Sequence, residues 1–283
     1  LVLKMNKKTK TELNLTDLSS LVKFTYDIMN MHPDTQAPFI GKSAFAHKGG
    51  IHVSAVMKDS NMYEHIDPKL VGNKQRVLVS DLSGKSNISF KANELDIKYK
   101  DSKEITGKLV SKVKDLEFEG YQFEAADASL ELILRELSGE YSPFFKVLDS
   151  KVHISYDESG TEKADATLKV LVGDDIEHTA SDGDGPVDAL NNALRKALAM
   201  FFPELKDVRL TDYKVRVLNE QEGTGAKVRV LIESAYEDDS WSTIGVSKNI
   251  IEASRQALSD SFNYRLAKLS NWSIKNKKSL QLS

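Results

Sequence analysis

The second half of this 283-residue sequence contains an internal repeat, which constrains the possible fold more than any other feature. The stretch "ATLKVLV" at 166–172 matches "AKVRVLI" at 226–232. In the same way, "GPVDALNNALRKAL" at 185–198 matches "GVSKNIIEASRQAL" at 245–258. Both matches predict that the two copies are offset by 60 residues along the chain.

Each copy of the repeat predicts three strands followed by a helix. The first strands are expected within "DSKVHIS" at 149–155 and "TDYKVRV" at 211–217. Apolar residues recur at every second position at Val152, Ile154 and Tyr156, which is typical of a strand with one buried face. The third strand of each copy is expected to be short. The first helix has one apolar stripe, formed by Leu190, Ala193, Leu194, Ala197, Leu198 and Phe201.

These patterns predict an α+β fold that ends in a duplicated βββα domain. A single helix covers only part of the apolar face of a three-stranded sheet. Two units packed together, and two chains, would bury that face better, so we expect this domain to dimerise.

A glycine precedes each predicted repeat helix, in "DGDGP" at 182–186 and in "TIGVS" at 243–247. A glycine at this position lets a ligand approach the first-turn N–H groups, which favour a carboxylate. Alternatively, Gly183, Gly185 and Gly245 only permit a tight turn between strand and helix. The residues leave both interpretations open.

The first half of the chain is less regular. A helix is expected from about residue 15 until the proline-containing stretch 31–38 ends it. The region 63–88 is expected to be rich in loops, with one strand at 76–79. Two helices are expected at 102–117 and 124–137, the second with candidate core positions that include Ala125, Ala128, Leu132 and Leu137.

Composition excludes several classes of protein. The chain has no cysteine, so it has no disulfide, cysteine nucleophile or thiolate metal site, and this composition fits a cytoplasmic protein. A net charge of -3 gives no reason to expect binding to nucleic acid or to an anionic membrane. No apolar run approaches the roughly 20 residues of a membrane span, and the N-terminus is not a signal peptide.

The stretch "GKSAFAHKGGIHVSAVMKD" at 41–59 holds two histidines but has no regular hydrophobic period. His47 and His52 are five residues apart, which excludes an H-x-x-x-H zinc helix. We expect no metal site within this chain. Histidine suits proton transfer near neutral pH, but in isolation His52 is expected to be structural. "LSGKSNI" at 82–88 lacks the upstream glycine of a phosphate-binding loop, so a turn with a solvated Lys85 is expected there.

Long motifs of the chain resemble the region that follows the catalytic barrel in the α-isopropylmalate, homocitrate and citramalate synthases. These motifs include "PFIGKSAFAHKGGIHVSAVMKD", "YQFEAADASLELILREL", "DGDGPVDALNNALRKAL" and "WSTIGVSKNIIEAS". The forms "HKGGIHVSAV", "YEHIDP" and "SDLSGKSN" resemble the citramalate synthase branch in particular. The resemblance extends along nearly the whole chain.

The resemblance implies a Claisen-type condensation of acetyl-CoA with pyruvate that gives (R)-citramalate, in isoleucine biosynthesis. The family's divalent metal is held by an acidic residue and an H-x-H pair on the barrel. No H-x-H occurs here, so we expect this chain to be part of a longer protein whose barrel precedes Leu1 and holds the metal. The chain alone is then expected to be inactive.

Site residues carry over from the family's motifs. The histidine of the family's G-I-H motif corresponds to His52 and is expected to assist proton transfer in the partner chain's barrel. Tyr63 and Asn61 are expected near the same site, whereas His47 is expected to be structural. The resemblance also implies a dimeric feedback domain that binds isoleucine, with effector contacts at Gly183, Gly185, Pro186, Val187, Gly245 and Val246.

The expected organisation has five segments. They are an end-of-barrel segment with a linker helix (1–37), a loop-rich linker subdomain (38–90), a helical linker subdomain (91–142), the duplicated βββα regulatory domain (143–270) and a tail (271–283). Two alternatives stay open: the same region of a 2-isopropylmalate or homocitrate synthase, and a stand-alone amino-acid-binding dimerisation module.

Overall fold

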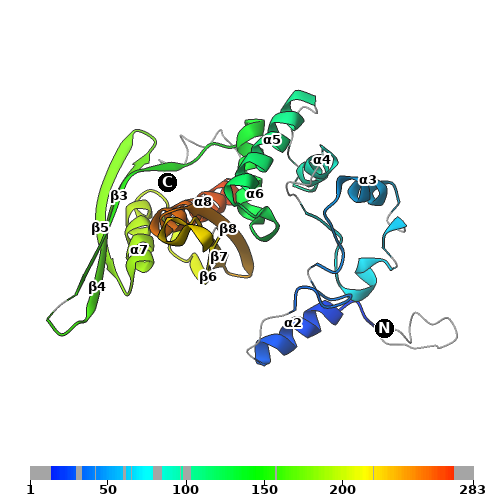
Figure 1. The fold of residues 1–283 in the computed structure, drawn as a ribbon, viewed down its shortest axis with the longest axis horizontal. Helices are drawn as coiled ribbons and strands as arrows, with labels where there is room; N and C mark the ends of the chain where they lie inside the picture. The colour runs from blue at the N-terminus through cyan, green and yellow to red at the C-terminus, as the bar shows by residue number, and fades with distance from the viewer. Residues whose placement is uncertain are drawn as a thin grey trace. The chain divides into compact units, whose positions relative to one another are not determined.

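A computed structural model describes residues 14–29, 34–41, 43–59, 62–64, 66–78, 85–95, 97, 103–156, 158–218 and 220–270. The chain divides into two compact units, Leu1–Asn93 and Glu94–Ser283 (Figure 1). Each unit is described by itself below.

The first unit is built from short helices around a small apolar core. Its elements are α2 (Leu18–Ile28), β1 (Ala46–His47), α3 (Gly50–Lys58), the 3-10 helix η2 (Pro68–Val71), β2 (Arg76–Val77) and α4 (Lys85–Glu94). β1 and β2 pair in parallel. The core side chains include Phe45, Val53, Val56, Val71, Val77, Ile88 and Ala92. Helix α2 confirms the helix expected after residue 15.

The expectation of a loop-rich region at 38–90 is wrong in part, because helices α3 and α4 lie within it. Among the α3 side chains whose burial the structure describes, two lie in the core, Val53 and Val56, which is too few apolar positions to produce a helical period. Helix α4 begins at Lys85, where we expected a turn. Its fully buried Asn87 donates from Nδ2 to the carbonyls of Lys48 (2.8 Å) and Leu78 (3.0 Å), so a polar residue fills a core position. The strand expected at 76–79 is described only at Arg76–Val77.

The second unit contains two antiparallel three-stranded sheets, each followed by a helix (Figure 1). The first half comprises β3 (Phe145–Tyr156), β4 (Glu162–Val172), β5 (Asp175–Gly183), α7 (Pro186–Ala199) and η4 (Pro203–Leu205). The second half comprises β6 (Arg209–Val217), η5 (Glu220–Gly225), β7 (Val228–Tyr236), β8 (Asp239–Ser247) and α8 (Ile250–Leu269). The expected α+β class and the order of three strands and a helix are observed. The third strands are not short, because β5 and β8 each have 9 residues.

Three further elements precede these sheets in the second unit. They are α5 (Lys103–Glu119), η3 (Phe123–Ala125) and α6 (Asp127–Ser138). The helix expected at 124–137 therefore starts three residues later. Ala128 and Leu132 are buried as expected, but Ala125 and Leu137 are exposed, so those two core assignments are wrong.

The predicted repeat offset of 60 residues is wrong, and the structural offset is 64 residues. Thr179 of β5 donates from Oγ1 to the carbonyl of Ala193 in α7 (3.1 Å). Thr243 of β8 makes the same bond to the carbonyl of Ala257 in α8 (2.8 Å), and both donor and acceptor lie 64 positions further along. A slip of four residues preserves the period of two in a strand and nearly preserves the 3.6-residue period of a helix. Hydrophobic patterns alone therefore matched the wrong register.

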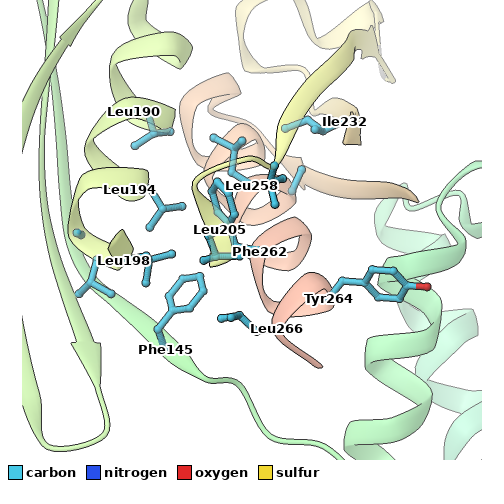
Figure 2. Close-up of a cluster of buried hydrophobic side chains, with 14 of the residues drawn as sticks. Phe145, Leu190, Leu194, Leu198, Leu205, Ile232, Leu258, Phe262, Tyr264 and Leu266 are labelled. Atoms are coloured by element: carbon cyan, nitrogen blue, oxygen red, sulfur yellow. The ribbon is translucent and has the colours of Figure 1, made fainter. Parts of the chain in front are cut away.

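One apolar core joins the two halves. Helix α7 packs on β4 and β5, helix α8 packs on β7 and β8, and the two helices contact each other. Leu190, Leu194 and Leu198 of α7 project toward Leu258 and Phe262 of α8 in the centre of this core (Figure 2). These five residues are at most 2% exposed, which confirms most of the predicted stripe of α7. Such close-packed burial is the main stabilising contribution of this unit.

Some predicted core residues are exposed. Ile154 pairs with the buried Ala164 and Tyr156 with the exposed Glu162, and the two side chains are 45% and 67% exposed. In the first unit, α2 exposes Leu21, Phe24 and Ile28 along one side. Among the described helices, none is both long and apolar enough to cross a membrane.

Candidate functional sites

His52 and Tyr63 come together in the first unit. His52 is in the first turn of α3, which begins after Gly49 without a side-chain cap. Tyr63 follows the helix, and the centroids of the two rings are 4.5 Å apart with planes inclined by 32°. Both side chains are accessible, Tyr63 with 48% of its surface exposed. Asn61, the third predicted catalytic residue, lies outside the described residues.

His47 lies in a buried ion-pairing arrangement instead. Its Nε2 is 3.0 Å from Oε1 of Glu64, and the two side chains are 11% and 4% exposed. The two side chains thus form a largely buried pair, and a structural role for His47 stays a prediction. Because Glu64 follows Tyr63 directly, the pair also fixes the segment that carries Tyr63. The sequence analysis did not predict that Glu64 would pair with His47. Its position directly after the candidate Tyr63 was a signal that could have drawn attention to it.

Four of the six predicted effector contacts gather where β5 leads into α7. Gly183 ends β5, and a Cβ there would lie 2.2 Å from the backbone nitrogen of Ala189, so this glycine is required for packing. Gly185 is the N-cap of α7 and Pro186 is its first residue. No side chain caps this helix, and a Cβ on Gly185 would meet nothing within 4 Å. There is therefore room for a side chain at Gly185, while Pro186 and Val187 are half-buried and Asp188 adds a carboxylate to the first turn.

The expectation that Gly245 leads directly into the second repeat helix is wrong. Gly245 and Val246 lie in β8, where a Cβ on Gly245 would approach the carbonyl oxygen of Ala253 to 2.0 Å. Helix α8 begins at Ile250, after Asn249, whose Oδ1 accepts a hydrogen bond from the nitrogen of Ile251 at 2.9 Å. Asn249 is thus the structural counterpart of Gly185. The four-residue slip in the sequence match caused this error.

Polar contacts that the sequence did not reveal attach α6 to the second half of the repeat. Ser129 donates from Oγ to Oδ2 of Asp260 in α8 (2.8 Å) and accepts from the nitrogen of Ile244 in β8 (3.1 Å). Tyr264 of α8 donates to Oε2 of Glu131 at 3.2 Å, and its side chain points toward α6 in Figure 2. Residues from two elements, α8 and β8, therefore converge on one side of α6.

Two ionisable groups in this contact have shifted pKa values. Burial raises the pKa of Asp260 to about 7, and the charge of Glu136 adds to the shift, while the hydrogen bond from Ser129 opposes it. Burial, with the charge of Glu131, also raises the pKa of the Tyr264 hydroxyl. Asp260 can therefore change charge near neutral pH.

The part of the chain that the structure describes contains no candidate metal site. No group of three or more His, Asp or Glu side chains there is arranged to hold a metal ion. The described residues thus do not fit the divalent metal that the family resemblance implies for its barrel.

Comparison with known proteins identifies the class of this fold. Residues 124–266 match the LeuA allosteric (dimerisation) domain, and residues 39–120 match the homocitrate synthase post-HMGL domain-like family. The first match covers both βββα halves together with α6. The chain therefore belongs to the LeuA allosteric (dimerisation) domain family.

Individual relatives show which named enzymes the chain resembles. An (R)-citramalate synthase of Geobacter sulfurreducens is 48% identical over 95% of this chain, and one of Aquifex aeolicus is 48% identical over 90%. A 2-isopropylmalate synthase of Methanocaldococcus jannaschii is 28% identical over 94%. The matched parts cover 51%, 48% and 48% of these relatives, so the chain spans about half of their length.

Proposed function

We propose that this chain is the C-terminal linker and allosteric regulatory region of a citramalate-forming enzyme. The whole protein would condense acetyl-CoA with pyruvate to (R)-citramalate and would be inhibited by isoleucine. The observation that carries this proposal is the 48% identity, over 95% of the chain, to a protein named (R)-citramalate synthase. Relatives at 39–48% identity bear the name (R)-citramalate synthase, which supports citramalate as the product.

In this proposal the first unit contributes to catalysis in a partner chain. The condensation joins the methyl carbon of the acetyl group to the keto carbon of pyruvate, so protons must move at both centres. His52 is accessible on α3 and lies against Tyr63, so it can reach a substrate outside its own unit. A positioned histidine typically contributes about 10²–10⁴-fold to such a step.

The effector would bind at the start of α7. Its uncapped first turn offers N–H groups and the positive end of the helix dipole to the carboxylate of an amino acid. Two chains associated through this domain would place two such sites in one dimer. Helix α6, attached to α8 through Ser129 and Glu131, would transmit the effect toward the linker. A coupling free energy of about 1–3 kcal/mol is typical of allosteric regulation.

Titration calorimetry of the chain with isoleucine, leucine and valine tests the regulatory part, with the association state measured by analytical ultracentrifugation. We expect a dimer that binds isoleucine more tightly than the other two. A dimer that binds none of the three contradicts an effector role. Substrate profiling of the whole protein with pyruvate and 2-oxoisovalerate tests the reaction separately.

A further inference from the structure

A cavity lies in the second unit, at the opposite end of α7 from the glycines. It has a volume of about 1180 Å³ and is lined by the start of β3, the residues that follow α7, and one side of α8. The 14 residues of α7 separate it from Gly185 by about 21 Å along the helix axis. The cavity is therefore distinct from the proposed effector site.

Asp260 contributes a carboxylate without a cationic partner to the wall of this cavity. Ser129 donates to Oδ2, and within residues 103–156, 158–218 and 220–270 no cation forms an ion pair with Asp260. Arg255 also lines the cavity, but its Nε and Nη2 bind the two carboxylate oxygens of Glu252 at 2.7 and 2.6 Å. A desolvated carboxylate without a counter-charge is unfavourable, and burial accordingly raises the pKa of Asp260.

Aromatic rings line the same cavity as Asp260. Asn263, one helical turn after Asp260, accepts a hydrogen bond from the backbone nitrogen of Phe144 at 2.9 Å. The ring of Phe144 packs edge-to-face on that of Phe202, with centroids 6.2 Å apart, and Phe201 follows at 6.4 Å from Phe202. All three phenylalanines line the cavity. Aromatic faces beside a carboxylate provide the two features that attract an organic cation.

We propose that this cavity binds a small organic ammonium ion with an apolar body. The ammonium group pairs with Asp260, and the apolar body packs against Phe144 and Phe201. A carboxylic acid without an ammonium group should bind more weakly, because the lining holds three carboxylates (Asp175, Glu204 and Asp260) against two cations (Lys146 and Arg255), and Arg255 already binds Glu252. The ligand would also reach α6, because Ser129 of α6 is hydrogen-bonded to Asp260.

Titration calorimetry of the full chain with isoamylammonium chloride tests this proposal. Isoamyl alcohol serves as the uncharged control with the same carbon skeleton. We expect the ammonium ion to bind at millimolar concentrations and the alcohol to bind at least tenfold more weakly, because a charge-assisted hydrogen bond is lost. Equal binding of both compounds, or no binding of the ammonium ion, overturns the proposal without need of any variant.

A pair of variants locates the site. Asp260→Asn keeps an oxygen that can accept from Ser129 but removes the charge, and should weaken isoamylammonium binding about tenfold. Asp239→Asn is the matched control, because this carboxylate already pairs with Lys268 at 3.0 Å, and it should leave binding unchanged. Unchanged affinity in Asp260→Asn overturns the proposal.

A competition experiment identifies the chemical source of the ammonium group. If isoleucine displaces isoamylammonium from the Gly185→Val variant, the natural ligand is an α-amino acid. If it does not, the ligand is an amine without a carboxylate. Both results support an ammonium site, and neither depends on the proposed function, since the probe binds without any enzymatic activity.

Discussion

The ring of His52 lies 4.5 Å from the ring of Tyr63, although the two residues belong to different segments of the first unit. Helix α3 positions the histidine, whereas the buried pair of His47 and Glu64 anchors the segment with the tyrosine. The two histidines of one short stretch thus have separate roles. One is buried in a structural pair, and the other faces outward with an aromatic neighbour.

Replacing His52 with alanine should lower turnover of the whole enzyme by about 10²-fold or more, because a proton-transfer group is removed. Steady-state kinetics with acetyl-CoA and pyruvate measure the effect. Tyr63→Phe keeps the ring contact and removes only the hydroxyl, so it separates stacking from hydrogen bonding. A loss of tenfold or less in His52→Ala, with unchanged thermal stability, would mean that His52 is structural.

His47→Ala should instead destabilise the first unit by about 1–3 kcal/mol, because it leaves the buried Glu64 carboxylate without its partner. Hydrogen exchange of the amides around each replaced histidine, with mass-spectrometric detection, reports the loss locally. His153→Ala is the matched control, since His153 and Asp165 form an exposed pair. Such a pair contributes about 0–1 kcal/mol, so equal effects of the two variants would refute a structural role for His47.

Two neighbouring glycines should respond differently to alanine. In Gly183→Ala the new Cβ meets the backbone nitrogen of Ala189 at 2.2 Å, so the free energy of unfolding should fall by about 1–3 kcal/mol. Gly185→Ala meets no atom within 4 Å and should cost less than about 1 kcal/mol. Urea unfolding of both variants checks this order. The reverse order would contradict the described turn.

In Gly185→Val the new side chain enters the space where the effector is proposed to bind. It should weaken isoleucine binding while leaving uninhibited turnover close to that of the parent enzyme. Calorimetry and inhibition curves measure the two quantities on one preparation. Retained isoleucine affinity would place the effector elsewhere.

Asp260 should make stability depend on pH. Its pKa is about 7 in the folded chain and 3.8 in the reference state, so the folded state holds the proton more tightly. The contribution of Asp260 to the free energy of unfolding is fully present below pH 4. It declines as the pH rises toward 7, by at most about 1.4 kcal/mol per pH unit. Urea unfolding at pH 5 and pH 8 should therefore differ less in Asp260→Asn than in the parent chain. Identical differences would contradict the shifted pKa.

Much of the fold could be predicted from the sequence, because patterns with a period of two or 3.6 residues report directly which side chains face a core. The strands and helices of the repeat and the stripe at Leu190, Leu194 and Leu198 followed from such patterns. Helix α4 did not, since its buried Asn87 is polar and is satisfied by carbonyls from other segments.

The sites were harder to predict, because they depend on contacts between distant residues. We predicted from the family motifs that His52 and Tyr63 lie near one site, and their rings are in contact in the structure. A role of these residues in catalysis stays a prediction. Nothing in the sequence indicated that Ser129 and Asp260, which are 131 residues apart, would form a hydrogen bond. The start of α8 was misplaced because a slip of four residues keeps the hydrophobic pattern intact.

The side chain of Asn249 accepts a hydrogen bond from the backbone nitrogen of Ile251 at the start of α8. The equivalent turn of α7 has no side-chain cap. The two halves share one architecture, yet only one of them leaves its helix dipole open to a carboxylate. Of the two helix starts in each chain, only that of α7 should therefore bind isoleucine. In the Asp260→Asn variant, which impairs the separate cavity, a titration that ends at a molar ratio of one would show that the two halves are alike in packing but differ in ligand recognition.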